Sequence, residues 1–147
     1  MGKASLDALL RLPLEAIDFA ANGGTNFTLV ELLRSDPAKK EVYEGLTKIG
    51  HSAEEMVDLT NELKKDNGNK YPTKTLIISG GVKGFLDGYY LHEKSLFPSL
   101  IGQASAMLKR ALISYEAVDE YLDYQHRGWA LCQNYLALKK NNPQCPQ

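Results

Sequence analysis

The chain has 147 residues, of which 44% are hydrophobic and 24% are charged, and its 17 basic and 18 acidic residues give a formal net charge of −1 at pH 7. This composition excludes a disordered chain, and the balanced charge excludes the basic surface that a nucleic-acid partner needs. No apolar run approaches the roughly 20 residues that span a bilayer. The length predicts one domain over residues 1–147, with a loop at 66–72 between two halves and a tail at 141–147.

The N-terminal segment is expected to be helical. Leucines at helical spacing predict a short helix around Leu6–Leu10, and a second helix begins near Pro13, because proline is tolerated in a first turn. Gly23 and Gly24 would end that second helix. The first residues lack the apolar segment of a signal peptide as written, but a secreted protein behind a new start codon would look the same, so the sequence leaves the compartment open.

Three helix-start signals follow. Thr28 and Ser52 each precede a glutamate by three residues, which is the capping-box pattern, and Asp36 directly precedes a proline. The second capping box predicts a helix over 53–65, with an apolar stripe on one face and two lysines in its last turn.

The segment 75–92 carries glycines at Gly80, Gly84 and Gly88, a spacing that places all three on one face of a helix. Because each glycine lowers helix stability by about 0.5–1 kcal/mol, we expect this face to be a close helix-packing surface, within the monomer or between two copies in a homodimer. The alternative is a strand over 75–79 that turns at Gly80 like a phosphate-binding loop. We favour the helix because no other segment reads as a strand partner.

Apolar residues at three- and four-residue steps predict a long amphipathic helix over 98–124. The pattern continues past Gly128, which either lies inside one very long helix or forms a turn between two antiparallel helices. We favour the turn. The sequence therefore predicts an all-α fold, a single-domain bundle of five to seven helices.

The second half offers two weak candidate sites. Asp119, Asp123 and His126 follow one another at helical steps and form a candidate divalent-metal site, although a solvated acidic face explains the same pattern. Cys132 and Cys145 lie too far apart for a metal-type motif and could form a disulfide if the tail folds back along its helix. No cofactor-binding motif is recognised.

Tyrosines and charged residues alternate in the C-terminal helix. The candidate partner-binding residues are Glu116, Glu120, Tyr121, Tyr124 and Arg127. Tyrosine beside charge is favoured at protein interfaces, although tyrosines of an ordinary surface show the same composition. Because no catalytic constellation is visible, the sequence favours a non-enzymatic module that binds a protein partner, of inhibitor, immunity or adaptor type. The alternative is a helical metal- or small-ligand-binding protein, which includes the possibility of an enzyme.

Overall fold

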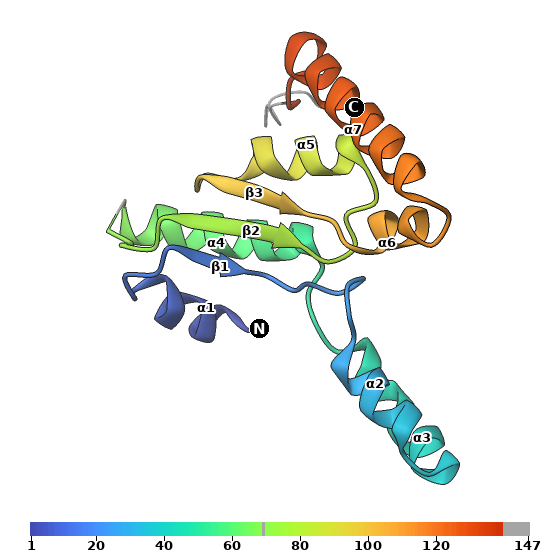
Figure 1. Cartoon of the computed structure of the whole chain (residues 1–147). Helices are drawn as coiled ribbons and strands as arrows, with labels where there is room; N and C mark the ends of the chain where they lie inside the picture. The colour runs from blue at the N-terminus through green and yellow to red at the C-terminus, as the bar shows by residue number, and fades with distance from the viewer. Residues whose placement is uncertain (69, 140–147) are drawn as a thin grey trace, which may run out of the picture.

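The structure is a computed structural model that describes residues 1–68 and 70–139 (Figure 1). Within these residues the chain is a mixed α/β protein, so the predicted all-α bundle is wrong. The strands are β1 (Ala16–Asp18), β2 (Thr75–Ser79) and β3 (Ser99–Gly102). The helices are α1 (Lys3–Leu10), α2 (Phe27–Arg34), α3 (Pro37–Tyr43), the 3-10 helix η1 (Glu44–Lys48), α4 (Ala53–Asn67), α5 (Phe85–Lys94), α6 (Ser105–Ala111) and α7 (Tyr115–Tyr135).

The three strands are parallel and stand in the order β1-β2-β3. Ile17 pairs with Leu76, and Leu76 pairs with Ser99 on its other side. The helix predicted over 75–92 is therefore wrong in its first part, and so is the second N-terminal helix, because Ala16–Asp18 is β1. The missing strand partners exist, but they have only three and four residues.

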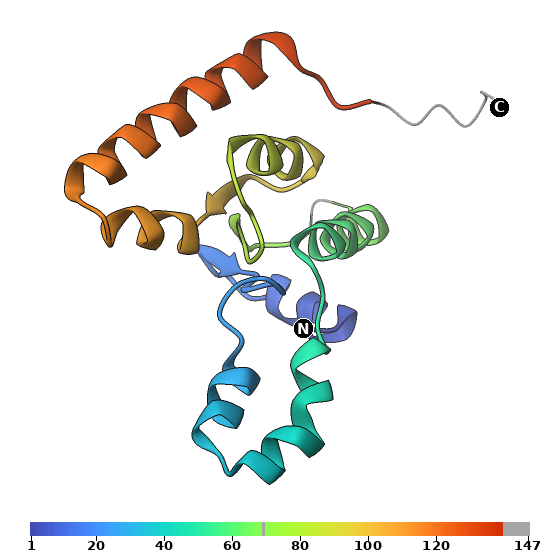
Figure 2. The same ribbon diagram turned by 90° about the vertical axis from the view of Figure 1, so that its right-hand side faces the viewer.

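Helices α1, α4 and α5 cover one face of the sheet. Figure 2 looks along the strands and shows these three helices on one side of them. Between helices and sheet lies the hydrophobic core, in which Leu6, Met56, Leu76 and Ile78 have relative exposures of 0–1%. Because side chains alternate along a strand, Leu76 and Ile78 face the helices while Thr75 and Ile77 point to the other face.

Helix α4 is confirmed as predicted. Ser52 accepts a hydrogen bond from the Glu55 N–H at 3.2 Å, and the Glu55 carboxylate accepts one from the Ser52 N–H at 2.7 Å, which completes the capping box. Before it, α2, α3 and η1 form an arm that projects from the body (Figures 1 and 2). Asp36 caps α3 as predicted, whereas α2 is capped by Asn26 and not by Thr28.

The predicted helix over 98–124 is also corrected. Its start is β3, and the remainder is divided between α6 and α7. Gly128 lies inside α7, so the predicted turn at this position is wrong. Helix α7 packs on α5, where Trp129 meets Tyr89 edge-on with ring centroids 5.7 Å apart. None of the helices in 1–68 and 70–139 is long and apolar enough to cross a membrane.

Candidate functional site

A cavity of about 820 Å³ lies at the carboxyl ends of the three strands. Parallel strands all end at the same edge of a sheet, so the loops that follow them converge there, and this edge is where α/β proteins bind ligands. The cavity is lined by residues from the end of each strand or just after it. Gly23 and Gly24 follow β1, Gly80 and Gly81 follow β2, Gly102 ends β3, and Ser105 begins α6. Backbone is therefore a large part of the cavity wall.

The loops after β1 and β2 meet backbone to backbone. Gly80 has φ +92°, and a Cβ added there would lie 2.1 Å from the Ala21 carbonyl oxygen. A Cβ on Gly23, which has φ +97°, would lie 2.6 Å from the Gly81 Cα. Only glycine fits both the left-handed conformation and the close approach. This geometry leaves backbone, without side chains, facing the cavity at these positions.

A polar cluster lies where β1 and β2 end. The Ser79 hydroxyl donates a hydrogen bond to the Asp18 carboxylate. The Ala20 N–H lies 2.9 Å from the Asp18 carboxylate and 3.1 Å from the Ser79 hydroxyl oxygen. Ala20 itself has φ +42°, which is uncommon outside glycine. The cluster therefore fixes a strained residue and places an exposed carboxylate at the cavity wall.

A second cavity, of about 300 Å³, adjoins the first and is lined by cations. Ser105 lines both cavities, and the second one also contains Lys83, Lys109 and Arg110. The Arg110 guanidinium lies 5.2 Å from the centre of the Tyr121 ring, which holds it by a cation–π contact. Three positive side chains beside a glycine-rich backbone wall provide the surroundings that phosphate groups require.

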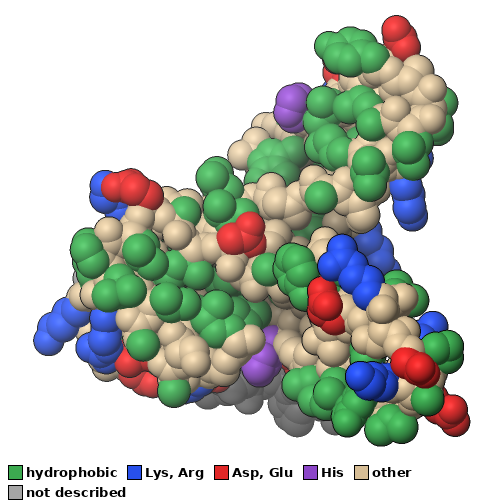
Figure 3. All heavy atoms as spheres, turned by 60° about the horizontal axis from the view of Figure 1, so that its bottom comes forward, with side chains coloured by type: hydrophobic (Ala, Val, Ile, Leu, Met, Phe, Trp, Pro, Cys, Tyr) green, Lys and Arg blue, Asp and Glu red, His purple; other side chains and the backbone are tan. Residues whose placement is uncertain are grey.

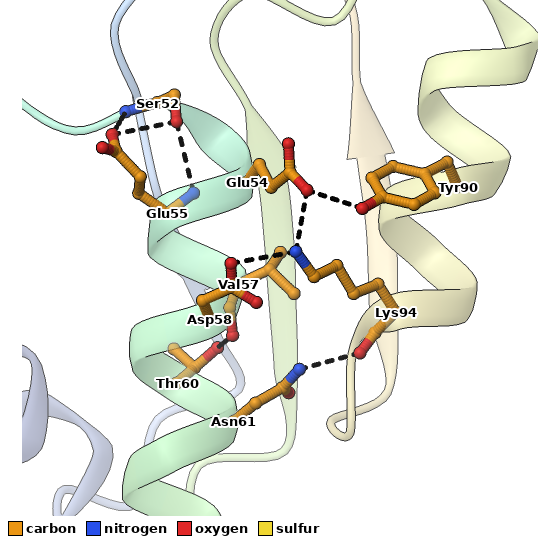
Figure 4. Close-up of polar contacts among 9 residues, drawn as sticks. All are labelled: Ser52, Glu54, Glu55, Val57, Asp58, Thr60, Asn61, Tyr90 and Lys94. Carbon is orange, nitrogen blue, oxygen red and sulfur yellow. Dashed lines mark hydrogen bonds and ion pairs between the residues drawn. The ribbon is translucent and has the colours of Figure 1, made fainter. Parts of the chain in front are cut away.

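A network of ion pairs joins α4 to α5 (Figure 4). The Lys94 ammonium lies 2.8 Å from Glu54 and 2.9 Å from Asp58, and the Tyr90 hydroxyl donates to Glu54. The hydrogen bonds from Lys94 and Tyr90 hold the pKa of Glu54 below its ordinary value. Burial acts to lower the pKa of Lys94, but the hydrogen bonds and charges of the two carboxylates raise it above its ordinary value.

The predicted partner-binding residues all lie on α7. The Tyr121 hydroxyl donates to the Lys83 carbonyl at 3.5 Å, and the Tyr124 hydroxyl donates to Glu120 at 2.8 Å. Arg127 pairs with Asp123 at 2.7 Å, and Glu116 is exposed in the first turn. Four of these five side chains are thus held by neighbours on α7 or in the adjacent loop, and only Tyr121 approaches the cationic cavity.

The three glycines of the predicted packing face do not share a helix. Gly80 lies in the loop after β2, Gly84 is the N-cap of α5, and Gly88 is buried within α5. A Cβ on Gly88 would lie 3.1 Å from Ile101 and 3.3 Å from Trp129, whereas Gly84 has only the Gln125 side-chain oxygen, 4.0 Å away. The close approach therefore occurs at Gly88, and Gly80 has a different role in the cavity wall.

The other candidate residues are more scattered. Cys132 is buried in α7, and Cys145 lies outside the described residues, so the predicted disulfide does as well. Asp119, Asp123 and His126 are exposed on α7. Over 1–68 and 70–139 no group of three or more His, Cys, Asp or Glu side chains is arranged to hold a metal ion.

The cavity residues were missed by sequence reasoning because Gly23 and Gly24 were interpreted as the end of a helix and Gly80 as part of a helix-packing face. The sequence contained a signal for the strands and their loops. Gly23, Gly80 and Gly102 each lie at the end of a short apolar segment or a few residues after it. Short apolar segments that are repeatedly followed by glycine are typical of β/α units, in which the backbone of the loop after each strand approaches a ligand.

One known protein gives a direct comparison. No protein-family model matches the chain. The chain is 32% identical over 116 residues to an isopentenyl-diphosphate delta-isomerase of Vibrio campbellii, and this match covers 78% of the chain and 32% of the relative. The chain thus spans about a third of the relative's length.

Similarity to an isomerase contradicts the predicted non-enzymatic protein-binding module. The similarity agrees better with the alternative, a metal- or small-ligand-binding protein, which includes the possibility of an enzyme. The helical bundle that this alternative assumed is wrong, because the fold contains a parallel sheet.

Proposed function

We propose that the carboxyl edge of the sheet binds the phosphate group of a small phosphorylated ligand, as part of an isomerase of the isopentenyl-diphosphate type. The observation that carries the proposal is the glycine-walled cavity beside Lys83, Lys109 and Arg110. Phosphate sites at the carboxyl face of β/α proteins use loops that follow neighbouring strands, as here. The name of the relative supplies a ligand of matching chemistry, a diphosphate.

The two cavities would make different contacts with the ligand. Gly80, Gly81 and Gly102 line the large cavity and carry no side chain, so their backbone can approach a phosphate oxygen closely. Lys109 and Arg110 add positive charge from the next cavity, and a diphosphate carries more negative charge than one glycine loop neutralises. Phe27 and Leu108 line the large cavity from the arm and from α6, and they offer apolar surface to a hydrocarbon group.

Binding is tested with inorganic pyrophosphate, followed through the backbone amide signals of the chain by NMR. Glycine amides resolve in a separate spectral region, so Gly80, Gly81 and Gly102 report directly. We expect saturable shifts at these three glycines, and the Lys109→Gln/Arg110→Gln variant should weaken binding by about tenfold or more. The matched control, Lys39→Gln/Lys65→Gln, removes two exposed lysines that line neither cavity and should leave the affinity unchanged.

Titrations with other phosphate-containing ligands identify which kind of molecule carries the phosphate group. Isopentenyl diphosphate should bind more tightly than pyrophosphate if the hydrocarbon is also recognised. Tighter binding of a chromophoric phosphate cofactor, for which pyridoxal phosphate and flavin mononucleotide serve as probes, would assign the site to a cofactor phosphate. The proposal is overturned if pyrophosphate causes no shift at the glycines, or if both double variants weaken its binding equally.

A further inference from the structure

A further cavity, of about 230 Å³, lies between α5, β3, α6 and α7. Its polar lining comes from Gln103, Gln125 and His126. Its apolar lining consists of the side chains of Phe85, Ile101, Met107, Leu122 and Trp129. Gln103 also lines the large cavity at the carboxyl edge of the sheet, so the two cavities are neighbours with different linings.

The space exists because the N-cap of α5 is a glycine. Gly84 lines the cavity, and a Cβ added there would have only the Gln125 side-chain oxygen near it, at 4.0 Å. One turn further along α5, a Cβ on Gly88 would lie 3.1 Å from Ile101 and 3.3 Å from Trp129. The backbone of Gly84 is extended, with φ −164°, a conformation that any residue adopts. The backbone therefore does not require glycine at this position, and the missing side chain leaves the cavity open.

Apolar surface by itself does not distinguish this cavity. Hydrophobic side chains reach the surface over much of one side of the molecule (Figure 3), and Leu100 in β3 is 61% exposed. The cavity differs because amide groups stand in its apolar wall, which is the usual form of a small-molecule site. Among the hydrogen bonds between described residues, the side chains of α7 that take part are Tyr121, Tyr124 and Asn134. The Gln125 amide is therefore available to a bound molecule.

The size and chemistry of the lining define the ligand. An apolar cavity of about 150 Å³ binds benzene, so this cavity of about 230 Å³ has room for one ring with a small substituent. The rings of Phe85 and Trp129 and the thioether of Met107 make favourable contacts with another aromatic ring. None of the described residues that line the cavity is Asp, Glu, Lys or Arg, so a charged group would lose its hydration without gaining an ionic partner.

We propose that this cavity binds an uncharged phenol of one ring, whose hydroxyl exchanges hydrogen bonds with the Gln125 amide. A hydroxyl suits this position because hydroxyl and amide groups each both donate and accept. A phosphate group has no cation to pair with in this lining, in contrast to the cavity that contains Lys83, Lys109 and Arg110. The site is therefore distinct from the proposed phosphate site.

The test titrates the chain with 4-methylphenol and follows the methionine methyl groups by NMR. The chain has three methionines. Met107 lines the cavity, whereas Met56 is 1% exposed in the core between the helices and the sheet. A bound aromatic ring should shift the Met107 signal saturably and leave Met56 unchanged, so Met56 is the internal control for a general effect of the phenol on the fold.

Two variants of α7 test the position of the bound ring. Leu122→Trp places a larger side chain in the cavity wall and should weaken 4-methylphenol binding by about tenfold or more. The matched control Leu131→Trp changes a leucine of the same helix that is 58% exposed and does not line the cavity, and it should leave the affinity unchanged.

A third variant tests the hydrogen bond. Gln125→Leu removes the amide and keeps a side chain of similar size. It should weaken 4-methylphenol binding by about threefold to tenfold, the effect of one hydrogen bond, and should leave the affinity for toluene unchanged. Toluene lacks only the hydroxyl, so the pair of ligands separates loss of the hydrogen bond from a change in the shape of the cavity.

Three results would overturn the proposal. The first is a Met107 signal that does not shift saturably up to about 5 mM 4-methylphenol, or that shifts no more than Met56. The second is equal weakening by Leu122→Trp and Leu131→Trp, and the third is a Gln125→Leu variant that affects both ligands alike. No phosphate is present in these measurements, so their outcome is independent of the proposed phosphate site.

Discussion

Gly128 offers the sharpest test of how α7 is packed. A Cβ at this buried position would lie 2.4 Å from Cδ1 and 2.5 Å from Cγ of Phe85 in α5. Cγ is held close to the backbone, so the ring cannot swing clear without moving α5. Overpacking of this kind destabilises by about 1–3 kcal/mol, while alanine in place of glycine stabilises a helix by about 1 kcal/mol. Because three ring atoms would lie within 2.6 Å of the new Cβ, we expect an overpacking cost in the upper part of that range, about 2–3 kcal/mol, and therefore a net loss of about 1–2 kcal/mol in the free energy of unfolding of Gly128→Ala.

Urea denaturation followed by circular dichroism measures this change, as a shift of roughly 0.5–1 M in the midpoint. Gly45→Ala is the matched control, because nothing lies within 4 Å of a Cβ added in η1, and its effect should be within about 0.5 kcal/mol of zero. Adding Phe85→Leu to Gly128→Ala should restore part of the loss, which a double-mutant cycle detects. A Gly128→Ala chain as stable as the parent would show that α5 and α7 do not meet as described.

Two further predictions concern α4. Ser52→Ala removes the N-cap of α4 and should destabilise the protein by about 1 kcal/mol, measured by urea denaturation. The control Ser5→Ala changes an exposed serine of α1 and should be neutral or slightly stabilising. Equal effects of the two changes would argue against the cap. The pKa of Glu54 is lowered in the folded state, so the ionised carboxylate stabilises the fold at a pH above the ordinary pKa of a glutamate. This stabilisation is lost as the pH falls through the pKa that Glu54 has in the folded protein. The urea midpoint should therefore fall in acid less steeply for Glu54→Gln than for the parent, and parallel pH profiles would contradict this.

The sequence predicted those elements whose signals are local. The capping box at Ser52 and the Asp36-Pro37 start are recognised from neighbouring residues, and both helices begin where expected. The strands depend on contacts between distant residues: Ile17 and Ser99 are partners of one residue, Leu76, and neither of their strands is long enough to show alternation. Without visible partners, the apolar segment at 75–79 was assigned to a helix.

The glycines explain why the site was missed along with the strands. Once 75–92 is expected to be one helix, Gly80, Gly84 and Gly88 become a packing face. Gly84 does not make the close helix contact expected of that face, because a Cβ added there meets only the Gln125 side-chain oxygen, 4.0 Å away. The tight contacts are at Gly88 and Gly128, where α5 meets β3 and α7. The four-residue spacing of the glycines does not reflect one shared helix face, because each glycine has a different structural role.

The exposed apolar surface connects the fold to the proposed site. Here Leu100 and the strand edges remain open while the loops above them already carry glycines with the left-handed geometry of a ligand wall. Close backbone packing between Gly23 and Gly81 forms that wall within this chain alone. Saturable binding of pyrophosphate at these glycines would therefore be a property of the loops that follow β1, β2 and β3.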